Sequence, residues 1–321
     1  MGLLEITAAI KSYDRHLALL TSRVQIPGIK LSVVEVKSED RFHERMLLER
    51  PWDVSELSLS SYIMAKSKGL PFTAIPIFPR RLFTHSQLYV RSGSEIKSPR
   101  ELLGRRVGLY GGYAQSLTVW VKGDLQREWG VGLDQVTWVT ADEKTGADFT
   151  PPSNVRLENT NDNLEELLLA GDIDALVSSM TPQRVVKKSN EIKYLFSDPP
   201  SEEVSYFKKH GIYPIMHVIA AKSEVLTKHP GIARGLYSAF EESKELACRY
   251  YQEDPVWSLI VGVPMLFQKQ RQIMGEENGW SNGVRANREY LDRFMQCQLD
   301  QGLIDHIMPT ETLFAEETWG T

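Results

Sequence analysis

The sequence is poor in cysteine and has no excess of positive charge. Its 321 residues include two cysteines, Cys248 and Cys297, whose wide separation fits neither a disulfide framework nor a metal-binding knuckle. We therefore expect two reduced thiols in a cytoplasmic protein. The formal net charge of −5 provides no general attraction for a phosphate backbone, so we expect no nucleic-acid partner.

Long apolar segments and signal-like features are missing as well. The longest apolar run, residues 212–221, contains His217 and is well short of the roughly 20 residues that span a bilayer. The N-terminus has no cationic segment followed by an apolar stretch and a small-residue cleavage site, so we expect no secretory signal. These features predict a protein that does not act in a membrane.

Several well-known catalytic motifs are absent. The chain has no Gly-x-Ser-x-Gly elbow, no Walker loop and no His-Glu-x-x-His helix, because His43-Glu44 lacks a second histidine four positions on. The pair Gly111-Gly112 lacks the spacing of a dinucleotide fingerprint. We therefore do not expect a serine hydrolase, a phosphate-loop ATPase or a zinc protease. No ligand spacing argues for a metal, and we predict that the protein uses neither a metal nor a cofactor.

The composition is that of a large globular protein. With 42% hydrophobic and 25% charged residues, the chain is long enough for about two domains. Short β-branched runs alternate with amphipathic segments, which is typical of α/β proteins with mostly parallel sheets. The predicted strands are residues 3–10, 30–36, 52–57, 72–78, 106–109, 136–139, 175–178, 192–196 and 213–222, and the predicted helices are residues 14–24, 42–48, 58–68, 116–129, 163–170, 223–229, 230–252 and 284–301.

Two α/β series follow each other along the chain. The second begins after residue 91 with Ser98-Pro99-Arg100-Glu101, a capping box that predicts a very short helix. Between its strands, residues 140–161 predict a long surface loop. Because a late strand returns to the first series, we predict two lobes, residues 1–91 with 217–321 and residues 92–216. Two hinge crossings would join them, with a cleft between the lobes where ligands of such folds bind.

Polar side chains gather at the predicted carboxyl ends of the first and third strands. Tyr13, Arg15 and His16 follow the first strand, and Glu56 and Ser58 end the third. A carboxylate is costly to bury unless it has a role, so we predict that these side chains lie at the mouth of the cleft. The alternative is that aspartate and serine cap the following helices while the arginine and the histidine lie in solvent.

Arginine and histidine follow the fourth strand, and another histidine lies within the last one. The guanidinium groups of Arg80 and Arg81 suit carboxylates, which they bind through two parallel hydrogen bonds, and His85 follows them. His217 stands in an otherwise apolar strand, where an imidazole facing the cleft would transfer protons near neutral pH. The alternatives are a solvated pair of arginines and a histidine hydrogen-bonded within the core.

The second lobe offers its own polar positions. The loop 110–116 connects a strand to a helix and contains a glycine pair, Tyr113 and Ser116, so its backbone would let an anion approach the helix N-terminus. Ser178 would add a hydroxyl after a later strand. Both features also fit ordinary tight turns.

Four segments, taken together, resemble the 4,5-dihydroxyphthalate decarboxylase family. They are Tyr13-Asp14-Arg15, residues 53–62, residues 78–86 and residues 211–217, and the resemblance extends to residues 287–288, 301–303 and 313–314. The family is similar in organisation to type II periplasmic binding proteins, which implies the same two-lobed fold. The sequence departs from the family pattern at Arg80, where the family has a small residue, and at Thr84, where it has a basic one.

The resemblance implies a carboxy-lyase that converts 4,5-dihydroxyphthalate to 3,4-dihydroxybenzoate and CO₂ in phthalate catabolism. Its partner would be a small aromatic dicarboxylate, and a homo-oligomer is the expected state. The predicted proton-transfer residues are His217, His85 and Glu56, and the predicted substrate-binding residues are Arg81, Arg15, Arg80, Tyr13, Ser58, Tyr113, Ser116 and Ser178. The alternatives are an aromatic-acid binding protein of the periplasmic type and another enzyme on the same scaffold.

Overall fold

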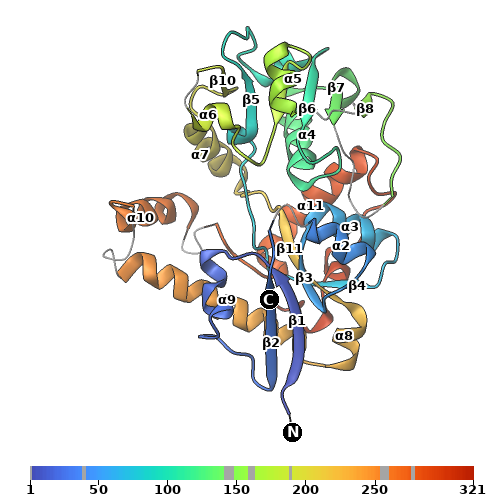
Figure 1. Cartoon of the computed structure of the whole chain (residues 1–321), viewed down its shortest axis with the longest axis vertical. Helices are drawn as coiled ribbons and strands as arrows, with labels where there is room; N and C mark the ends of the chain where they lie inside the picture. Colours follow the sequence, from blue (N-terminus) through green and yellow to red (C-terminus); the bar gives the residue numbers. More distant parts are fainter. Residues whose placement is uncertain are drawn as a thin grey trace. The chain divides into compact units, whose positions relative to one another are not determined.

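The computed structural model describes residues 2–37, 41–140, 148–157, 163–187, 190–253, 260–275 and 279–321 (Figure 1). The chain divides into two compact units, each with its own sheet. Unit 1 comprises Met1–Arg81, Ile215–Asp292 and Met308–Thr321, and unit 2 comprises Leu82–Pro214 and Arg293–Ile307. The prediction of two α/β lobes is therefore confirmed.

Unit 1 is built on a five-stranded mixed sheet. Its strands are β1 (Leu4–Ile10), β2 (Ile29–Glu35), β3 (Val54–Ser58), β4 (Phe72–Ile75) and β11 (His217–Lys222). They lie in the order β2-β1-β3-β11-β4. β1 is parallel to β2 and β3, whereas β11 is antiparallel to both of its neighbours. A strand from late in the chain thus lies next to the centre of this sheet.

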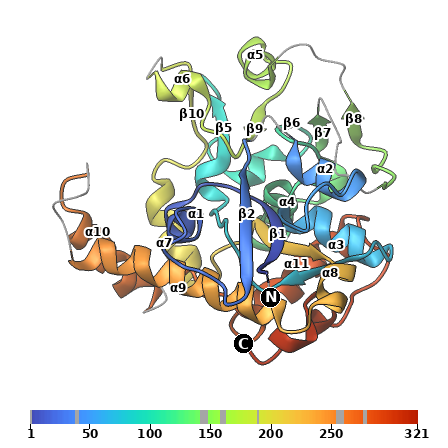
Figure 2. The same cartoon turned by 60° about the horizontal axis from the view of Figure 1, so that its bottom comes forward.

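Helices pack around the sheet of unit 1. The longest, α9 (Ile232–Glu253), contacts the sheet and has α10 (Val263–Met274) beside it in both views (Figures 1 and 2). The other helical segments, with 3₁₀ helices labelled η, are η1 (Asp14–His16), α1 (Leu17–Leu20), α2 (Phe42–Leu48), α3 (Leu59–Ser67), α8 (Ser223–Lys228), η7 (Thr310–Leu313), η8 (Glu316–Thr318) and the first part of α11 (Val284–Asp300).

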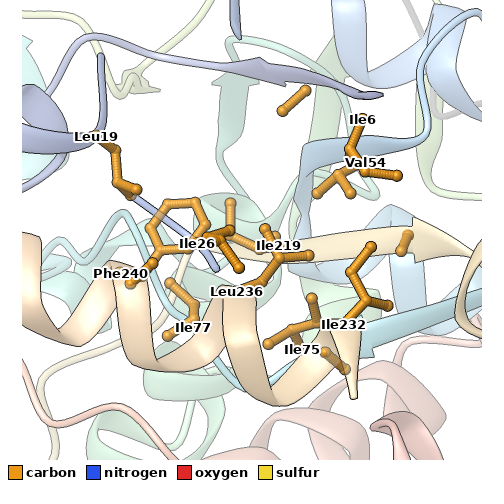
Figure 3. Packing of buried hydrophobic residues seen from close by; sticks show 14 of the residues in the cluster. Ile6, Leu19, Ile26, Val54, Ile75, Ile77, Ile219, Ile232, Leu236 and Phe240 are labelled. Carbon is orange, nitrogen blue, oxygen red and sulfur yellow. The ribbon is translucent and has the colours of Figure 1, made fainter. Parts of the chain in front are cut away.

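The core of unit 1 joins segments that are far apart in the sequence (Figure 3). Ile6 and Val54 from the first strands belong to one buried cluster with Ile219 from β11 and with Leu236 and Phe240 from α9. Full burial of such a side chain contributes about 1.5–3 kcal/mol. Because β11 and α9 follow most of unit 2 in the chain, only the returning chain can complete this core.

Unit 2 contains a six-stranded sheet. Its strands are β5 (Leu88–Arg91), β6 (Arg106–Leu109), β7 (Thr137–Thr140), β8 (Val155–Leu157), β9 (Ala175–Val177) and β10 (Ile192–Tyr194). They lie in the order β10-β5-β9-β6-β7-β8. β5 is antiparallel to β9 and β10, and the remaining neighbours are parallel.

The helices of unit 2 begin and end at recognisable local signals. Ser98 and Glu101 form the predicted capping box, and α4 (Ser116–Trp129) has the predicted bounds and ends at Gly130, which has a positive φ of 66°. Gly111 and Gly112, before α4, have φ of 86° and 101°, values that favour glycine. The other helical segments are η3 (His85–Gln87), η4 (Pro99–Leu102), η5 (Leu133–Gln135), α5 (Leu164–Ala170), α6 (Gln183–Val186) and α7 (Pro199–His210).

Several details of the predicted fold are corrected. The sheets are mixed rather than mostly parallel, because β5 and β11 run against their neighbours. The predicted loop 140–161 contains β8, and its residues 141–147 and 158–161 lie outside the described part of the chain. The predicted strand 72–78 ends before Pro76, and the predicted helix 14–24 is only η1 and α1.

The limits of the two units also differ from the predicted lobes. The boundaries fall after residues 81 and 214 instead of 91 and 216, and Arg293–Ile307 belongs to unit 2. The first difference arises because β5 pairs with β9 and β10, which are strands of unit 2. The last arises because α11 begins in unit 1 and ends in unit 2.

Candidate active site

The candidate active site of unit 1 is centred on Glu56, whose side chain is fully buried in β3. The hydroxyl of Tyr13 donates to Oε1 of Glu56 at 2.8 Å, and Nδ1 of His217 is hydrogen-bonded to the same oxygen. The backbone N–H of Lys11 donates to Oε2 at 3.2 Å. A buried carboxylate is tolerated only with such donors, and here two segments of the chain supply them, the residues that follow β1 and the start of β11.

Strand pairing brings Glu56 and His217 together. In the antiparallel register of β3 and β11, His217 lies opposite Ser58, and Ile219 lies opposite Glu56. Because side chains two residues apart in a strand share a face, Glu56 and His217 are diagonal neighbours on one face of the sheet. Ser58, which is 7% exposed, shares that face at the end of β3.

The bond to Glu56 determines which nitrogen of His217 carries a proton. An ionised carboxylate only accepts hydrogen bonds, so Nδ1 of His217 is the donor and Nε2 of the neutral ring keeps its lone pair. This is the arrangement of a general base, in which the carboxylate orients the imidazole and stabilises its charged form after proton uptake.

Burial and hydrogen bonding set the charges of this pair. Burial lowers the pKa of His217, and the bond to Glu56 offsets only part of that effect. Burial raises the pKa of Glu56, but the hydrogen bond from His217 acts in the opposite direction, and the pKa of Glu56 lies below its usual range. Glu56 is therefore ionised and His217 is neutral at pH 7.

Two further histidines surround the pair. Nδ1 of His43 donates to the backbone carbonyl of Glu56 at 2.9 Å, and the ring of His43 lies 4.7 Å from that of His217. Nδ1 of His16 lies 3.1 Å from the carbonyl of Lys11. Burial lowers the pKa of His43 to about 3 and that of His16 to about 4, so both rings are neutral at pH 7. The sequence left open whether His16 lies at the predicted site or in solvent. His16 is buried, so its placement in solvent is wrong.

The guanidinium group of Arg15 lies between two aromatic rings. Its central carbon is 4.2 Å from the ring centre of Tyr13 and 4.1 Å from that of Trp280. Nε donates to the carbonyl of Pro79 at 2.9 Å, and Nη1 pairs with Asp14 at 3.0 Å. These contacts fix Arg15 beside Tyr13, and its predicted contact with substrate stays a prediction.

The neighbouring residues Arg80 and Arg81 have different surroundings. Arg81 is 2% exposed, and its Nη2 donates to the carbonyl of Ser281 at 2.8 Å and to Oδ1 of Asn287 at 2.5 Å. Arg80 is half-buried, its carbonyl accepts the backbone N–H of His217 at 3.3 Å, and its charge lowers the pKa of His217. Arg81 thus joins the chain after β4 to the start of α11, and its predicted carboxylate-binding role stays a prediction.

His85, predicted as a proton-transfer residue, belongs to unit 2. Its ring lies 5.1 Å from that of Phe196 and 5.2 Å from that of Tyr206, and burial lowers its pKa to about 4. Its Nδ1 has no hydrogen-bond partner within the described part of the chain. His85 is therefore a neutral imidazole in an aromatic environment, and its catalytic role stays a prediction.

The other predicted site residues of unit 2 also take part in local structure. The carbonyl of Tyr113 accepts a hydrogen bond of 2.7 Å from Lys122, a buried lysine of α4, and Ser116 is the buried first residue of α4. The hydroxyl of Ser178 donates to the carbonyl of Met180 at 2.7 Å and so closes a turn. The substrate-binding roles of these three residues stay predictions.

Comparison with known proteins identifies the family. The chain is 30% identical over 327 residues to 4,5-dihydroxyphthalate decarboxylase from Comamonas testosteroni, a match that covers 98% of this chain and 97% of that protein. This chain belongs to the 4,5-dihydroxyphthalate decarboxylase family. A relative of the same name from Pseudomonas putida is 29% identical over 216 residues, 65% of this chain and 83% of that protein. No family model matches the chain.

Solved structures show that this decarboxylase-family chain has the fold of periplasmic binding proteins. It resembles the periplasmic aliphatic sulphonate binding protein SsuA from Escherichia coli with a TM-score of 0.59 and 12% identity, over 97% of this chain and 92% of that one. A sulfonate-binding protein SsuA from Methylobacillus flagellatus KT gives 0.62 and 14%, over 99% and 93%. The desulfurization enzyme DSZB gives 0.53 and 14%, over 99% and 98%. The predicted fold class is confirmed.

The described part of this decarboxylase-family chain was searched for metal sites and for membrane-spanning helices. Among the residues that the structure describes, no group of three or more His, Cys, Asp or Glu side chains is arranged to hold a metal ion. Within the same residues, none of the helices has the length and apolar character needed to cross a membrane.

Sequence reasoning missed two functional candidates of this family member. One is His43, which was considered only as a fragment of a zinc motif, although its helix α2 directly precedes β3. The other is Asp124 in α4, which accepts hydrogen bonds from the hydroxyl of Thr84 at 2.9 Å, that of Tyr206 at 3.0 Å and Nη2 of Arg293 at 3.1 Å. Burial raises the pKa of Asp124 to about 6. No sequence signal marked it, because an acid within a helix is ordinarily solvated.

Proposed function

We propose that this protein is a non-oxidative carboxy-lyase that converts 4,5-dihydroxyphthalate to 3,4-dihydroxybenzoate and CO₂. The relative from Comamonas testosteroni, which matches nearly the whole chain, carries this activity in its name. The structural observation that supports the proposal is the buried pair of Glu56 and His217. Ligand binding alone does not require a buried carboxylate that orients a neutral imidazole, whereas proton transfer does.

His217 is the general base in this proposal. In the substrate, each hydroxyl lies para to one carboxylate. Nε2 of His217 removes the proton of one hydroxyl, and the phenolate pushes electron density onto the ring carbon that bears the para carboxylate. A proton adds to that carbon, its bond to the carboxylate breaks, CO₂ leaves and the bonding electrons restore the aromatic phenolate. His217 then returns its proton to the phenolate oxygen, so the only proton consumed is the one added to carbon.

Glu56 and Tyr13 are positioning residues for this base. Glu56 fixes the tautomer of His217 and stabilises the imidazolium that forms, and Tyr13 donates to Glu56 at 2.8 Å. Positioned proton transfer contributes a factor of about 10² to 10⁴ in rate, so orientation and electrostatics must supply the remainder. A second group must donate the proton that is added to the ring carbon. His85 of unit 2 stays a predicted proton-transfer residue for this step.

The substrate is a dianion and needs cations beside the base. Arg80 is half-buried next to His217, and the charges of Arg80 and Lys11 both lower the pKa of His217. We assign the carboxylate that remains on the ring to the guanidinium group of Arg80, which can form two parallel charge-assisted hydrogen bonds with it. Ser58, at the end of β3, adds a hydroxyl on the same face of the sheet.

Turnover of defined substrates tests the function. Purified, chelator-treated protein is incubated with 4,5-dihydroxyphthalate, with phthalate and with each monohydroxyphthalate, and CO₂ and the aromatic product are followed. We expect stoichiometric CO₂ and 3,4-dihydroxybenzoate from the first, and no product from phthalate, which has no hydroxyl to deprotonate. Tight binding of 4,5-dihydroxyphthalate that is recovered unchanged would instead support an aromatic-acid binding protein, a role that the similarity in fold to sulphonate-binding proteins favours.

Arg80 and Arg81 provide a matched pair of variants, because one substitution should weaken substrate binding and the other should lower the stability of the fold. Arg80→Gln should raise the Kd of 4,5-dihydroxyphthalate about 10- to 100-fold without changing the melting temperature, because it removes charge-assisted bonds to the substrate. Arg81→Gln should lower the melting temperature by at least about 5 °C, because its buried bonds to Ser281 and Asn287 are lost. Calorimetric titration and thermal melts measure both effects. The reverse pattern would assign the carboxylate to Arg81.

The proposal also includes a cytoplasmic location and a homo-oligomeric state. Cys248 and Cys297 are both free thiols, the state expected of cysteines in a reducing compartment, and Cys297 is also buried. Symmetric homo-oligomers are the common assembly of soluble enzymes.

A further inference from the structure

Strand β2 leaves one side of its backbone open. It lies at one edge of the sheet in unit 1, where β1 is its neighbour (Figures 1 and 2). The pairing with β1 continues without interruption over all seven residues of β2, Ile29–Glu35. Among the described helices and strands, only β1 packs along the length of β2. An open edge of this kind is a place where a further strand can pair.

The hydrogen bonds of β1 show which backbone groups of β2 face away from the sheet. The N–H of Leu4 donates to the carbonyl of Gly28 at 3.0 Å, at the start of the parallel pairing of β1 and β2. Because the N–H and C=O of successive residues in a strand point to opposite sides, the even-numbered residues of β2 bond to β1. The odd-numbered residues of β2 therefore direct their N–H and C=O groups outward.

Three of the outward N–H groups have no acceptor within the described part of the chain. They belong to Leu31, Val33 and Glu35. The N–H of Ile29 donates to the carbonyl of Ile26 at 3.0 Å, so Ile29 offers the edge only its own carbonyl. The open edge of β2 thus has three donors and the carbonyls of all four odd-numbered residues.

The side chains of β2 also suit contact with another strand. Leu31 and Val33 pack on the core cluster of unit 1 but stay partly exposed, and Val34 on the opposite face is 41% exposed. The strand contains no proline, and its one lysine, Lys30, already pairs with Glu5 of β1 at 3.2 Å. Prolines and unpaired lysines commonly keep edge strands apart, so this edge has little protection against pairing.

We propose that β2 pairs with β2 of a second copy of this chain, antiparallel about a twofold axis at Ser32, so that two five-stranded sheets form one continuous sheet. The inference rests on the homo-oligomeric state proposed above and assigns its interface. In this register all seven residues overlap, Leu31 lies opposite Val33 of the second copy, and Ile29 lies opposite Glu35. Each of the three unpaired N–H groups of one copy then meets a carbonyl of the other.

A second copy of the chain fits this edge because the arrangement is self-complementary. The register places Lys30 opposite Val34 of the other copy, where the aliphatic stem of the lysine covers the exposed valine. No like charges lie opposite each other, whereas a parallel pairing in register would oppose each Lys30 with its own copy. A twofold axis also closes the assembly, which is the commonest symmetry of soluble homo-oligomers.

Disulfide trapping tests this register. Ser32 and its copy form a pair without hydrogen bonds on the axis, with a Cα separation of about 4.5 Å, which lies within the range of a disulfide. Ser32→Cys, made in a Cys248→Ser background, should therefore give a covalent dimer under mild oxidation. Val34→Cys is the matched control, because Val34 shares the face of Ser32 and is more exposed, yet its copies lie at least about 13 Å apart. It should cross-link at least about tenfold more slowly than Ser32→Cys.

Light scattering on a proline variant tests the interface independently. The unchanged protein at micromolar concentration should have at least twice the chain mass of 36.5 kDa. Val33→Pro should halve the mass of the assembly, because the proline ring replaces an outward N–H and collides with the carbonyl that it would meet, while the bonds to β1 remain. Val33→Thr keeps the N–H and should leave the assembly unchanged. Circular dichroism verifies that both variants are folded.

The results separate this interface from the other proposals. A monomeric unchanged protein, an assembly that persists in folded Val33→Pro, or cross-linking of Val34→Cys as fast as that of Ser32→Cys overturns the inference. The cysteine variants test the same interface without altering the backbone. An assembly that persists in Val33→Pro would leave the proposed homo-oligomer in place on another surface, and none of these results bears on the turnover of 4,5-dihydroxyphthalate.

Discussion

Replacing His217 by asparagine should lower the turnover of 4,5-dihydroxyphthalate at least about 100-fold while leaving the fold intact. The asparagine side chain keeps an N–H that can donate to Glu56, but it has no basic nitrogen in place of Nε2, so the proton transfer is lost. Single-turnover assays of CO₂ release measure the effect on chemistry separately from product release.

A surface histidine provides the control for this substitution. His306 is exposed, and His306→Asn should turn over like the unchanged protein. Circular dichroism and thermal melts of both variants establish that the comparison is between folded proteins. Turnover of His217→Asn within a few-fold of normal would exclude His217 as the base, and the proposed mechanism would fail with it.

Replacing Glu56 by glutamine should lower kcat about 10- to 100-fold and move the acid limb of the kcat/KM profile to lower pH. Glutamine has the same shape but no charge, so the loss corresponds to a charged hydrogen bond of about 1.5–3 kcal/mol. The sign of the pH shift follows from the effect of Glu56 on the pKa of His217. The bond to Glu56 raises the pKa of His217 against burial, and without the carboxylate that pKa falls further. His217 then stays neutral to lower pH but is a weaker base.

The pH profile distinguishes this role from a structural one. A substitution that merely loosened the packing around β3 would lower activity at every pH without moving the acid limb. Glu5, an exposed glutamate of β1, serves as the control, and Glu5→Gln should leave both kcat and the profile unchanged. An acid limb that stays in place or moves to higher pH in Glu56→Gln would show that the carboxylate does not control His217.

Local signals in the sequence predicted many of the elements but not their pairing. The bounds of α4 and β6 and the capping box at Ser98 were predicted because each depends on a few adjacent residues. Helix α7 was missed, since the prolines at 199 and 200 resemble a break, yet Asp198 caps the helix and proline fits its first turn. The antiparallel direction of β11 could not be predicted, because it depends on contacts between distant segments.

The same distinction applies to the candidate site. Glu56 and His217 were singled out as polar residues in apolar strands, but their hydrogen bond follows from the register of β3 and β11, which no local pattern contains. The sequence also could not separate Arg80 from Arg81. The two are neighbours in the sequence, yet Arg81 donates to the carbonyl of Ser281 and the amide of Asn287, whereas Arg80 lies beside His217.

The position of β11 between β3 and β4 has a consequence for biosynthesis. A nascent chain that has emerged only as far as unit 2 lacks the strand that completes the first sheet, so β3 and β4 have open edges and Glu56 lacks its imidazole partner. Formation of the proposed catalytic pair of Glu56 and His217 must therefore wait until β11, which ends at residue 222, has left the ribosome. Shortened chains that end before β11 should depend on chaperones, because unpaired strand edges promote aggregation.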